Sequence, residues 1–263
     1  MVSRGPAAPV IELSGVSFRY DHGPPIIEGF DLSIETGQFV VIIGPSGCGK
    51  TTALNLVAGF EQPTTGSVRF RGRPVERPSI ERPVVFQGDD SLYSWLTVRE
   101  NVEFGLRMLG VDKEQRAARS DKYLEMVGLR EHAYKFPHQL SGGMKQRVQL
   151  ARALVCEAEV ILMDEPFGAL DAQTRLVLQD ELVQICQMAR VTVMFITHDI
   201  SEAVLLADKV CVMRAGPASN IVNVADVTLQ RPRRRSDLAF GQLFESLHTA
   251  LADQARLAMA QPR

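Results

Sequence analysis

The chain carries the segment Gly44-Pro45-Ser46-Gly47-Cys48-Gly49-Lys50-Thr51 between an apolar run, residues 39–43, and a helix-patterned segment that begins at Thr52. A buried strand, a glycine-rich turn and a helix, in that order, form the setting of a phosphate-binding loop. Glycines allow the tight turn in which several N–H groups converge on phosphate oxygens, and the helix N-terminus adds a favourable dipole. A chance glycine-rich turn is the alternative. The match at all four constrained positions and at both flanks disfavours it.

Three side chains of this segment have expected roles. Lys50 is expected to reach the β- and γ-phosphates of a bound nucleotide. The hydroxyl of Thr51 is expected to complete the coordination shell of a Mg²⁺ ion. The thiol of Cys48 lies at a helix N-terminus, which predicts a lowered pKa. A bulky thiol reagent should therefore block nucleotide binding unless nucleotide is already present.

The bulk numbers describe an ordinary soluble globular protein. Its 263 residues, 45% hydrophobic and 23% charged, suffice for one large α/β domain or two small ones. The formal net charge of -2 gives no reason to expect nucleic acid as a partner. No apolar run approaches the roughly eighteen residues of a membrane span. Residues 1–9 lack the apolar core of a signal peptide, so we expect a flexible arm and a cytosolic chain.

The four cysteines, Cys48, Cys156, Cys186 and Cys211, are scattered along the chain without a Cys-x-x-Cys pair or a nearby histidine cluster. This spacing speaks against a metal site and against a disulfide framework. Apart from Cys48, we expect these residues to be buried small hydrophobes in a reducing compartment.

Two kinds of strand pattern occur along the chain. Alternation of apolar and polar residues predicts a small antiparallel sheet from residues 11–20, 30–34 and 67–70. Continuous apolar runs, typical of buried parallel strands, occupy residues 39–43, 160–163, 191–196 and 210–213. Roughly residues 90–155 form a predicted helical insert with its own small core. Its first helix starts at a capping box, Thr97 with Glu100, and presents one apolar face made of Val98, Val102, Leu106 and Leu109.

Polar side chains stand at the ends of three short apolar strands. Gln87 ends the run 84–87, Asp164 and Glu165 follow residues 160–163, and His198 follows residues 191–196. The carboxyl ends of parallel strands are where α/β sheets bind ligands. Asp164 is expected to reach Mg²⁺ through water, and Glu165 to orient and deprotonate a water molecule. The alternatives are a solvated turn for the two carboxylates and a satisfied polar residue for the histidine.

The triplet Ser141-Gly142-Gly143 opens a helix pattern inside the predicted insert. A polar triplet of this kind is most often an N-cap. Its backbone N–H groups and its hydroxyl also suit a second anion-binding helix terminus. The other motifs of the chain favour the second interpretation.

Together these motifs resemble the nucleotide-binding subunit of an ABC transporter, over about residues 11 to 215. In that family's terms the phosphate loop is residues 44–51 followed by Thr52, Gln87 is the Q-loop glutamine, and Leu140 to Met144 is the signature motif. Residues 160–164 are the Walker B strand, Glu165 is the catalytic glutamate, and His198 is the switch histidine. Asp171 ends the D-loop and lies near nucleotide. Tyr20 matches the aromatic residue that stacks on adenine, with Phe18 as the competing candidate.

The resemblance implies a fold and a set of ligands and partners. The implied fold is α/β, a P-loop NTPase core with a mainly parallel sheet, an antiparallel β subdomain and a helical subdomain that carries the signature motif. The nucleotide-binding domain spans residues 10–215, and residues 216–263 form an extension with a short helix. ATP and Mg²⁺ are the implied cofactors, with Mg²⁺ held by Thr51, Gln87 and Asp164. The implied partners are a second copy in a head-to-tail dimer, an integral-membrane permease and, indirectly, a periplasmic or extracellular solute-binding protein, with no nucleic acid.

Within the family the chain looks most like importer subunits of the nitrate, sulfonate and taurine group, placed at the cytoplasmic face of the cell membrane. This narrower resemblance rests on residues 95–101, 164–171, 197–203 and 231–233. Met144, Ser94 and residues 88–90 depart from the usual pattern. The alternative function is that of a soluble ABC-type ATPase, acting as a nucleotide-driven clamp on a non-membrane partner.

Three further segments carry expectations of their own. Tyr93 and Trp95 are either a docking face for a short permease helix or part of the core of the insert. Residues 231–235, Arg-Pro-Arg-Arg-Arg, are expected to form a solvated basic linker, with contact to anionic lipid headgroups as the weaker alternative. Beyond that linker, four apolar residues share one helical face: Phe240, Leu243, Phe244 and Leu247.

Overall fold

The computed structural model of the protein describes residues 9–21, 23–86 and 91–260. The predicted Q-loop residue Gln87 and the atypical residues 88–90 lie outside this part of the chain. By its internal contacts the chain divides into two compact units. The first unit is Met1–Pro78 together with Thr192–Arg263, and the second unit is Ser79–Val191.

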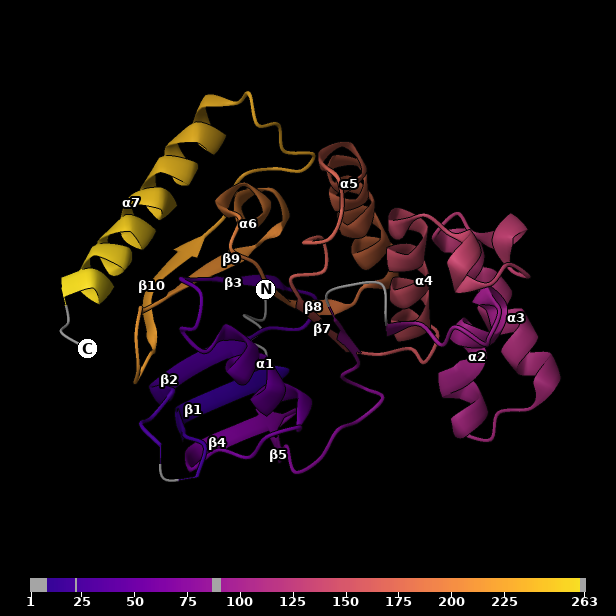
Figure 1. Ribbon diagram of the computed structural model, residues 1–263, viewed down its shortest axis with the longest axis horizontal. Helices are drawn as coiled ribbons and strands as arrows, with labels where there is room; N and C mark the ends of the chain where they lie inside the picture. Colours follow the sequence, from indigo (N-terminus) through magenta and orange to yellow (C-terminus); the bar gives the residue numbers. More distant parts are fainter. Residues whose placement is uncertain (1–8, 22, 87–90, 261–263) are drawn as a thin grey trace, which may run out of the picture. The chain divides into compact units, whose positions relative to one another are not determined.

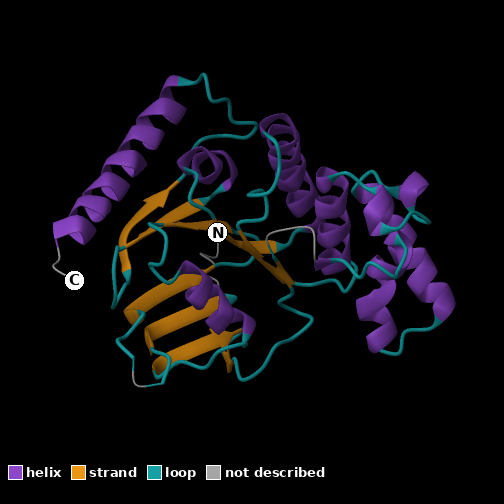
Figure 2. Ribbon diagram, in the orientation of Figure 1, coloured by secondary structure: helices purple, strands orange, loops and turns teal. Residues whose placement is uncertain are grey.

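The first unit contains an antiparallel sheet with the strand order β2-β1-β4-β5 (Figures 1 and 2). The strands are β1 (Ile11–Phe18), β2 (Ile27–Ile34), β4 (Thr65–Phe70) and β5 (Arg73–Pro74). Alternate residues of β2 are buried from Phe30 to Ile34, as expected for a strand with one face in the core. Ile11 pairs with Ile34 on one side and with Phe70 on the other, and all three are buried, so the end of the sheet at which β1 begins is apolar.

The first unit also contains the strand that leads into the phosphate loop. This strand, β3 (Phe39–Ile43), lies parallel to and between β8 (Thr192–Ile196) and β9 (Lys209–Met213). Every residue of β3 and β8 is buried, which explains their unbroken apolar sequences. The outer strand β10 (Ile221–Asp226) pairs antiparallel with β9 and was not predicted.

The described residues of the first unit form three helices. Helix α1 (Lys50–Ala58) packs against β4 and β8, α6 (Ile200–Leu206) packs against β3, and α7 (Leu238–Ala260) packs against α6 and β9. Helix α7 is longer than the short helix expected in the tail: it has 23 residues and continues well past Leu247. Phe240 and Leu247, from the predicted apolar face, are buried.

The second unit is mainly helical. Its strands β6 (Val84–Val85) and β7 (Val160–Asp164) are parallel. Its helices are α2 (Val98–Met108), α3 (Lys113–Met126), α4 (Gly142–Leu154) and α5 (Ala172–Ala189), with 3-10 turns at Arg130–His132 and Pro137–Gln139. The predicted capping box of α2 is confirmed. Leu109 is half exposed because α2 ends before it.

The prediction of a solvated basic linker at residues 231–235 is wrong. The guanidinium of Arg233 is buried, with the residue only 8% exposed, and Arg231 forms an ion pair with Asp208 at 2.6 Å. A guanidinium has five N–H donors, so it can be buried where a cluster of carbonyl oxygens accepts its hydrogen bonds.

Among the described residues, no helix combines the length and apolar character that a bilayer crossing requires.

Candidate active site

The phosphate loop joins β3 to α1, and two of its glycines have backbone angles that only glycine adopts readily. Gly47 has φ 77° and Gly49 has φ 92°. A Cβ atom at Gly49 would lie 3.0 Å from Cγ2 of Ile26, which is tighter than ordinary van der Waals contact, so Ile26 would have to shift to admit a side chain. Gly49 also caps α1 without a side-chain hydrogen bond. The first-turn N–H groups of a helix have no partner within the helix, so they are suited to an anion here.

Lys50 is held across this loop. Its ammonium donates to the carbonyl oxygens of Gly44 at 2.9 Å and of Pro45 at 3.0 Å, and the residue is 7% exposed. A polyphosphate in the loop would offer charged acceptors, which form stronger hydrogen bonds than neutral carbonyls. Thr51, next in the helix, is exposed and presents a hydroxyl oxygen, the type of ligand that Mg²⁺ prefers. Glycine cradle, lysine and hydroxyl therefore fit a nucleotide with its metal.

The predicted reactivity of Cys48 is wrong. The residue is fully buried, and a Cβ atom at Gly44 would lie 2.8 Å from its Sγ, so the sulfur fills the inside of the loop. Burial raises the pKa of Cys48, and the nearby Lys50 ammonium offsets only part of this effect. The thiol is therefore protonated and shielded from reagents.

The two candidates for adenine stacking differ in exposure. Phe18 is 5% exposed, whereas Tyr20 is 50% exposed, and the two rings meet edge to face with centroids 4.8 Å apart. Burial, and then the carboxylate of Glu61, raise the pKa of Tyr20. Only the Tyr20 ring has a face open to a ligand, and the buried Phe18 ring supports it from beneath.

His198 is exposed between β8 and α6, and the residues around it are fixed by hydrogen bonds. The buried Thr197 hydroxyl donates to Oε2 of the buried Glu202 at 2.6 Å and accepts from the Asp199 N–H at 3.0 Å. Asp199 caps α6 by accepting from the N–H groups of Ser201 and Glu202. The backbone is therefore anchored on both sides of His198.

In the second unit, the predicted metal ligand and the predicted base end the strand β7. Asp164 is its last residue, and Glu165 follows in the left-handed region with φ 44°. A residue with a Cβ atom is uncommon in that region, and such strain often accompanies a functional role. The Gly168 N–H donates to the Glu165 carbonyl at 3.1 Å and closes the turn.

The signature triplet forms the start of α4. Ser141 is the exposed N-cap, and its Oγ accepts from the Met144 N–H at 3.3 Å, so the N-cap interpretation is confirmed. Gly143 is buried, and a Cβ atom there would lie 2.7 Å from Cγ2 of Thr174 in α5. The second glycine therefore permits close packing of α4 on α5.

Asp171, the predicted D-loop residue, caps α5. Its Oδ1 accepts from the N–H groups of Gln173 at 3.1 Å and Thr174 at 3.0 Å. The Thr174 side chain, and then these N–H groups, lower the pKa of Asp171. The carboxylate stays exposed and charged at the start of the helix on which the signature triplet packs.

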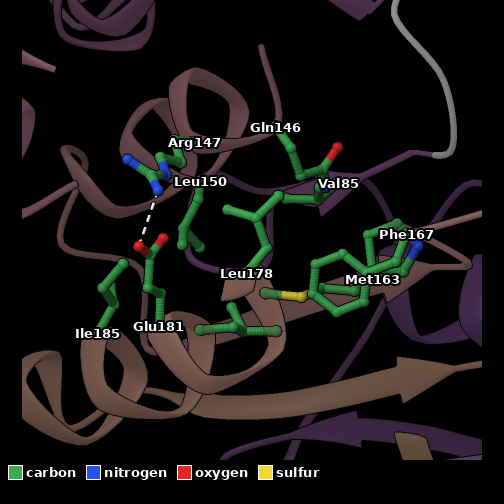
Figure 3. A pocket seen from close by; sticks show the side chains of 11 residues that line it. Val85, Gln146, Arg147, Leu150, Met163, Phe167, Leu178, Glu181 and Ile185 are labelled. Atoms are coloured by element: carbon green, nitrogen blue, oxygen red, sulfur yellow. Dashed lines mark hydrogen bonds and ion pairs between the residues drawn. The ribbon is translucent and has the colours of Figure 1, made fainter. Parts of the chain in front are cut away.

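An ion pair missed in the sequence braces the two helices of this packing. Arg147 Nη2 on α4 lies 2.7 Å from Glu181 Oε1 on α5, at the edge of a narrow, mostly apolar pocket (Figure 3). Leu150, Met163 and Phe167 line the same pocket, so α4, α5 and the Walker B strand enclose it. The pair is separated by 34 residues, and no local pattern could have revealed it.

The core alternative for Trp95 is wrong, because this residue is 71% exposed. Its ring lies beside Tyr93, with centroids 5.3 Å apart, on a loop that the buried side chain of Asn101 holds. Asn101 accepts from the Tyr93 N–H and donates to the carbonyls of Tyr93 and Leu96. Trp95 thus stands on a fixed loop.

A family model described as ABC transporter matches residues 27–168, which is more than half of the chain. The chain belongs to the ABC transporter family. The nitrate import ATP-binding protein NrtD of Synechococcus elongatus is 46% identical over 244 residues, which are 91% of this chain and 88% of that protein.

Two further comparisons extend this result. The bicarbonate transport ATP-binding protein CmpC of the same organism is 46% identical over 227 residues, but the chain spans only 34% of CmpC. The structure of CbiO1 from Clostridium perfringens, described as part of the ABC transporter complex CbiONQ, superimposes with a TM-score of 0.79 at 24% identity. It covers 95% of this chain, which confirms the expected ABC ATPase fold.

Proposed function

We propose that this ABC family member is the ATP-hydrolysing subunit of an importer, and that it energises uptake of a small anionic or zwitterionic solute through a separate membrane permease. The observation that carries the proposal is the glycine cradle with the Lys50 ammonium held across it, a site shaped for a polyphosphate. Similarity to NrtD along nearly its whole length favours solutes of the nitrate, sulfonate and taurine type.

ATP binds with its adenine on the Tyr20 ring and its phosphates in the loop of residues 44–51. The Lys50 ammonium then exchanges its carbonyl partners for β- and γ-phosphate oxygens. Thr51, Asp164 and Gln87 are the proposed Mg²⁺ ligands, since all three offer oxygen atoms. When bound, Mg²⁺ neutralises charge on the phosphate oxygens.

Glu165 is the proposed general base for the attacking water. A positioned base of this kind contributes roughly 10² to 10⁴ in rate. The strained backbone at Glu165 is consistent with a carboxylate held where packing alone would not place it. His198 contacts the γ-phosphate and stabilises the charge of the transition state.

The signature triplet acts on the ATP of a second copy. Ser141 is exposed at the positive end of α4, so a γ-phosphate bound in the partner's loop would interact favourably with it. ATP thereby holds two copies head to tail, and hydrolysis releases them. Asp171, charged and close to Gly143 through Thr174, lies beside this contact.

The permease docks on the loop of Tyr93 and Trp95. An exposed tryptophan on a fixed loop loses little conformational freedom on binding, which makes it a suitable anchor for a helix. The subunit would then lie at the cytoplasmic face of the membrane, and the solute-binding protein would contact only the permease.

The test is the variant Glu165→Gln. Turnover should be lost while ATP binding is kept, so an ATP-bound dimer should accumulate in size-exclusion chromatography. Glu76→Gln, which alters an exposed carboxylate far along the sequence, is the control and should hydrolyse ATP normally. Near-normal hydrolysis by Glu165→Gln would remove Glu165 from its proposed role.

A second experiment addresses the solute. The chain is co-expressed with candidate permease and solute-binding proteins, and ATPase activity of the reconstituted complex is measured with nitrate, taurine and an alkanesulfonate. Stimulation by one of them identifies the solute. No association with any permease would favour a soluble ATPase instead.

A further inference from the structure

Helix α6 is short, and the carbonyl groups at its C-terminal end are satisfied by arginines from far along the chain. The last carbonyls of a helix have no partner within the helix. Arg233 Nη1 donates to the carbonyls of Val204 at 2.9 Å and Leu205 at 3.1 Å, and Arg231 Nη2 donates to that of Leu206 at 2.5 Å. The seven residues of α6 thus end against two guanidinium groups.

Arg233 makes the larger share of these contacts. Its Nη1 also donates to the Ala207 carbonyl at 2.6 Å, and its Nε donates to the Leu229 carbonyl at 3.0 Å. Burial lowers the pKa of Arg233 to about 10, which still leaves the side chain charged at neutral pH. A cation at a helix C-terminus also interacts favourably with the helix dipole.

The neighbouring arginines tie the same segment to the rest of the first unit. Arg231 Nη1 pairs with Asp208, whose other carboxylate oxygen accepts from the Phe39 N–H at 2.8 Å at the start of β3. Arg235 Nε donates to the Ser201 hydroxyl at 3.0 Å in the first turn of α6. The segment therefore contacts α6 at both ends.

The opposite end of α6 carries the anchors on either side of His198. The buried Thr197–Glu202 hydrogen bond joins the end of β8 to the first turn of α6, and the Asp199 cap joins the intervening turn to that same turn. So short a helix has little stability of its own, because most of its backbone groups lie in a terminal turn. A change at its C-terminal end therefore reaches the residues that hold His198.

We infer that Arg233 is a positioning residue for His198: by capping α6, it fixes where the switch histidine stands relative to the phosphate loop of the same unit. This inference rests on the proposed ATPase function, in which His198 contacts the γ-phosphate. Arg233 touches no substrate. The C-terminal segment thereby sets the rate of hydrolysis without contributing a group to it.

The test compares four full-length proteins, wild type, Arg233→Gln, His198→Ala and the double variant, by ATP hydrolysis. Misplacement of a catalytic group by about 1 Å can lower a rate by up to about 100-fold, so we expect kcat of Arg233→Gln to fall between 10- and 100-fold with KM for ATP unchanged. In the His198→Ala background the same substitution should cause no further fall, because its effect passes through the histidine. Arg234→Gln, an exposed neighbour, is the matched control and should retain wild-type kcat.

Two results would overturn the inference. One is an equal fractional loss of kcat from Arg233→Gln in both backgrounds, as general destabilisation predicts. The other is a folded Arg233→Gln protein with kcat within about twofold of wild type. If His198→Ala itself leaves hydrolysis unchanged, the proposed role of His198 fails instead, which separates the two hypotheses.

A second measurement covers the case in which Arg233→Gln does not fold or the double variant is too slow to assay. Arg233→Lys keeps the charge but loses the fork of donors. In histidine-selective NMR, the His198 resonance, assigned by its loss in His198→Ala, should shift in Arg233→Lys and stay in place in Arg234→Gln. An unmoved His198 resonance in Arg233→Lys would contradict the inference that Arg233 positions His198.

Discussion

The thiol of Cys48 illustrates how burial and a nearby cation compete at one side chain. A helix N-terminus and the Lys50 ammonium both favour the thiolate, yet desolvation outweighs them because the sulfur lies inside the loop. The same residue at the outer surface of the loop would have a lowered pKa. The direction in which the side chain points thus decides its chemistry.

We therefore expect Cys48 to resist thiol reagents in the native chain. After treatment with a bulky aromatic disulfide at pH 7.5, peptide mapping should find Cys48 unmodified and ATP hydrolysis unchanged. The same reagent in urea should label it, which is the control for intrinsic reactivity. Native labelling of Cys48 that bound ATP prevents would contradict this expectation.

At the scale of elements, the start of α4 depends on its contact with α5. Gly143 has no room for a Cβ atom because the Thr174 methyl group stands 2.7 Å from that position. The contact joins the exposed Ser141 cap to the helix that Asp171 caps. A shift of one helix end therefore moves both motifs.

Gly143→Ala should lower the free energy of unfolding by about 1–3 kcal/mol, the usual cost of overpacking, and weaken ATP-driven dimerisation. Thr174→Ser removes the methyl group that the new Cβ would meet and keeps the hydroxyl, so it should restore both properties in the double variant. Urea denaturation and size-exclusion chromatography measure the two effects. Failure of Thr174→Ser to rescue would show that the glycine is needed for a different reason.

Elements built from local patterns could be predicted from the sequence, and contacts between distant segments could not. The phosphate loop follows from an apolar run, glycines and a helix start within twenty residues, and the capping box at Thr97 spans four. Arg233, by contrast, meets carbonyls 26 to 29 residues away. Nothing in its neighbourhood in the sequence distinguishes it from a solvated arginine. The burial of Cys48 depends instead on the direction in which its side chain points within the loop, and the pattern of residue types does not reveal that direction.

At the scale of the whole molecule, each unit contains a buried cysteine, and ionisation of its thiol favours the unfolded chain. Burial raises the pKa of Cys186 in the second unit and of Cys211 in the first to about 12. In the unfolded chain these thiols ionise near their ordinary pKa of about 8.5. Unfolding therefore releases protons above that pH, so stability is fully present below it and falls as pH rises toward 12.

Each of these two thiols should remove about 1.4 kcal/mol of stability per pH unit between pH 9 and 11. Urea denaturation at several pH values, with reductant present, measures the slope of the free energy of unfolding against pH. Cys211→Ala should be less stable at pH 7 because of the lost packing, but its slope should be shallower by about that amount. An unchanged slope would mean that the Cys211 thiol ionises equally in both states.

Trp95 is the single tryptophan among the 263 residues, and it stands exposed on the loop that Asn101 holds rigid. An indole surrounded by water emits at longer wavelength than one covered by apolar surface. The unlabelled chain thus contains a natural optical reporter, whose fluorescence shifts to the blue when another protein covers that loop.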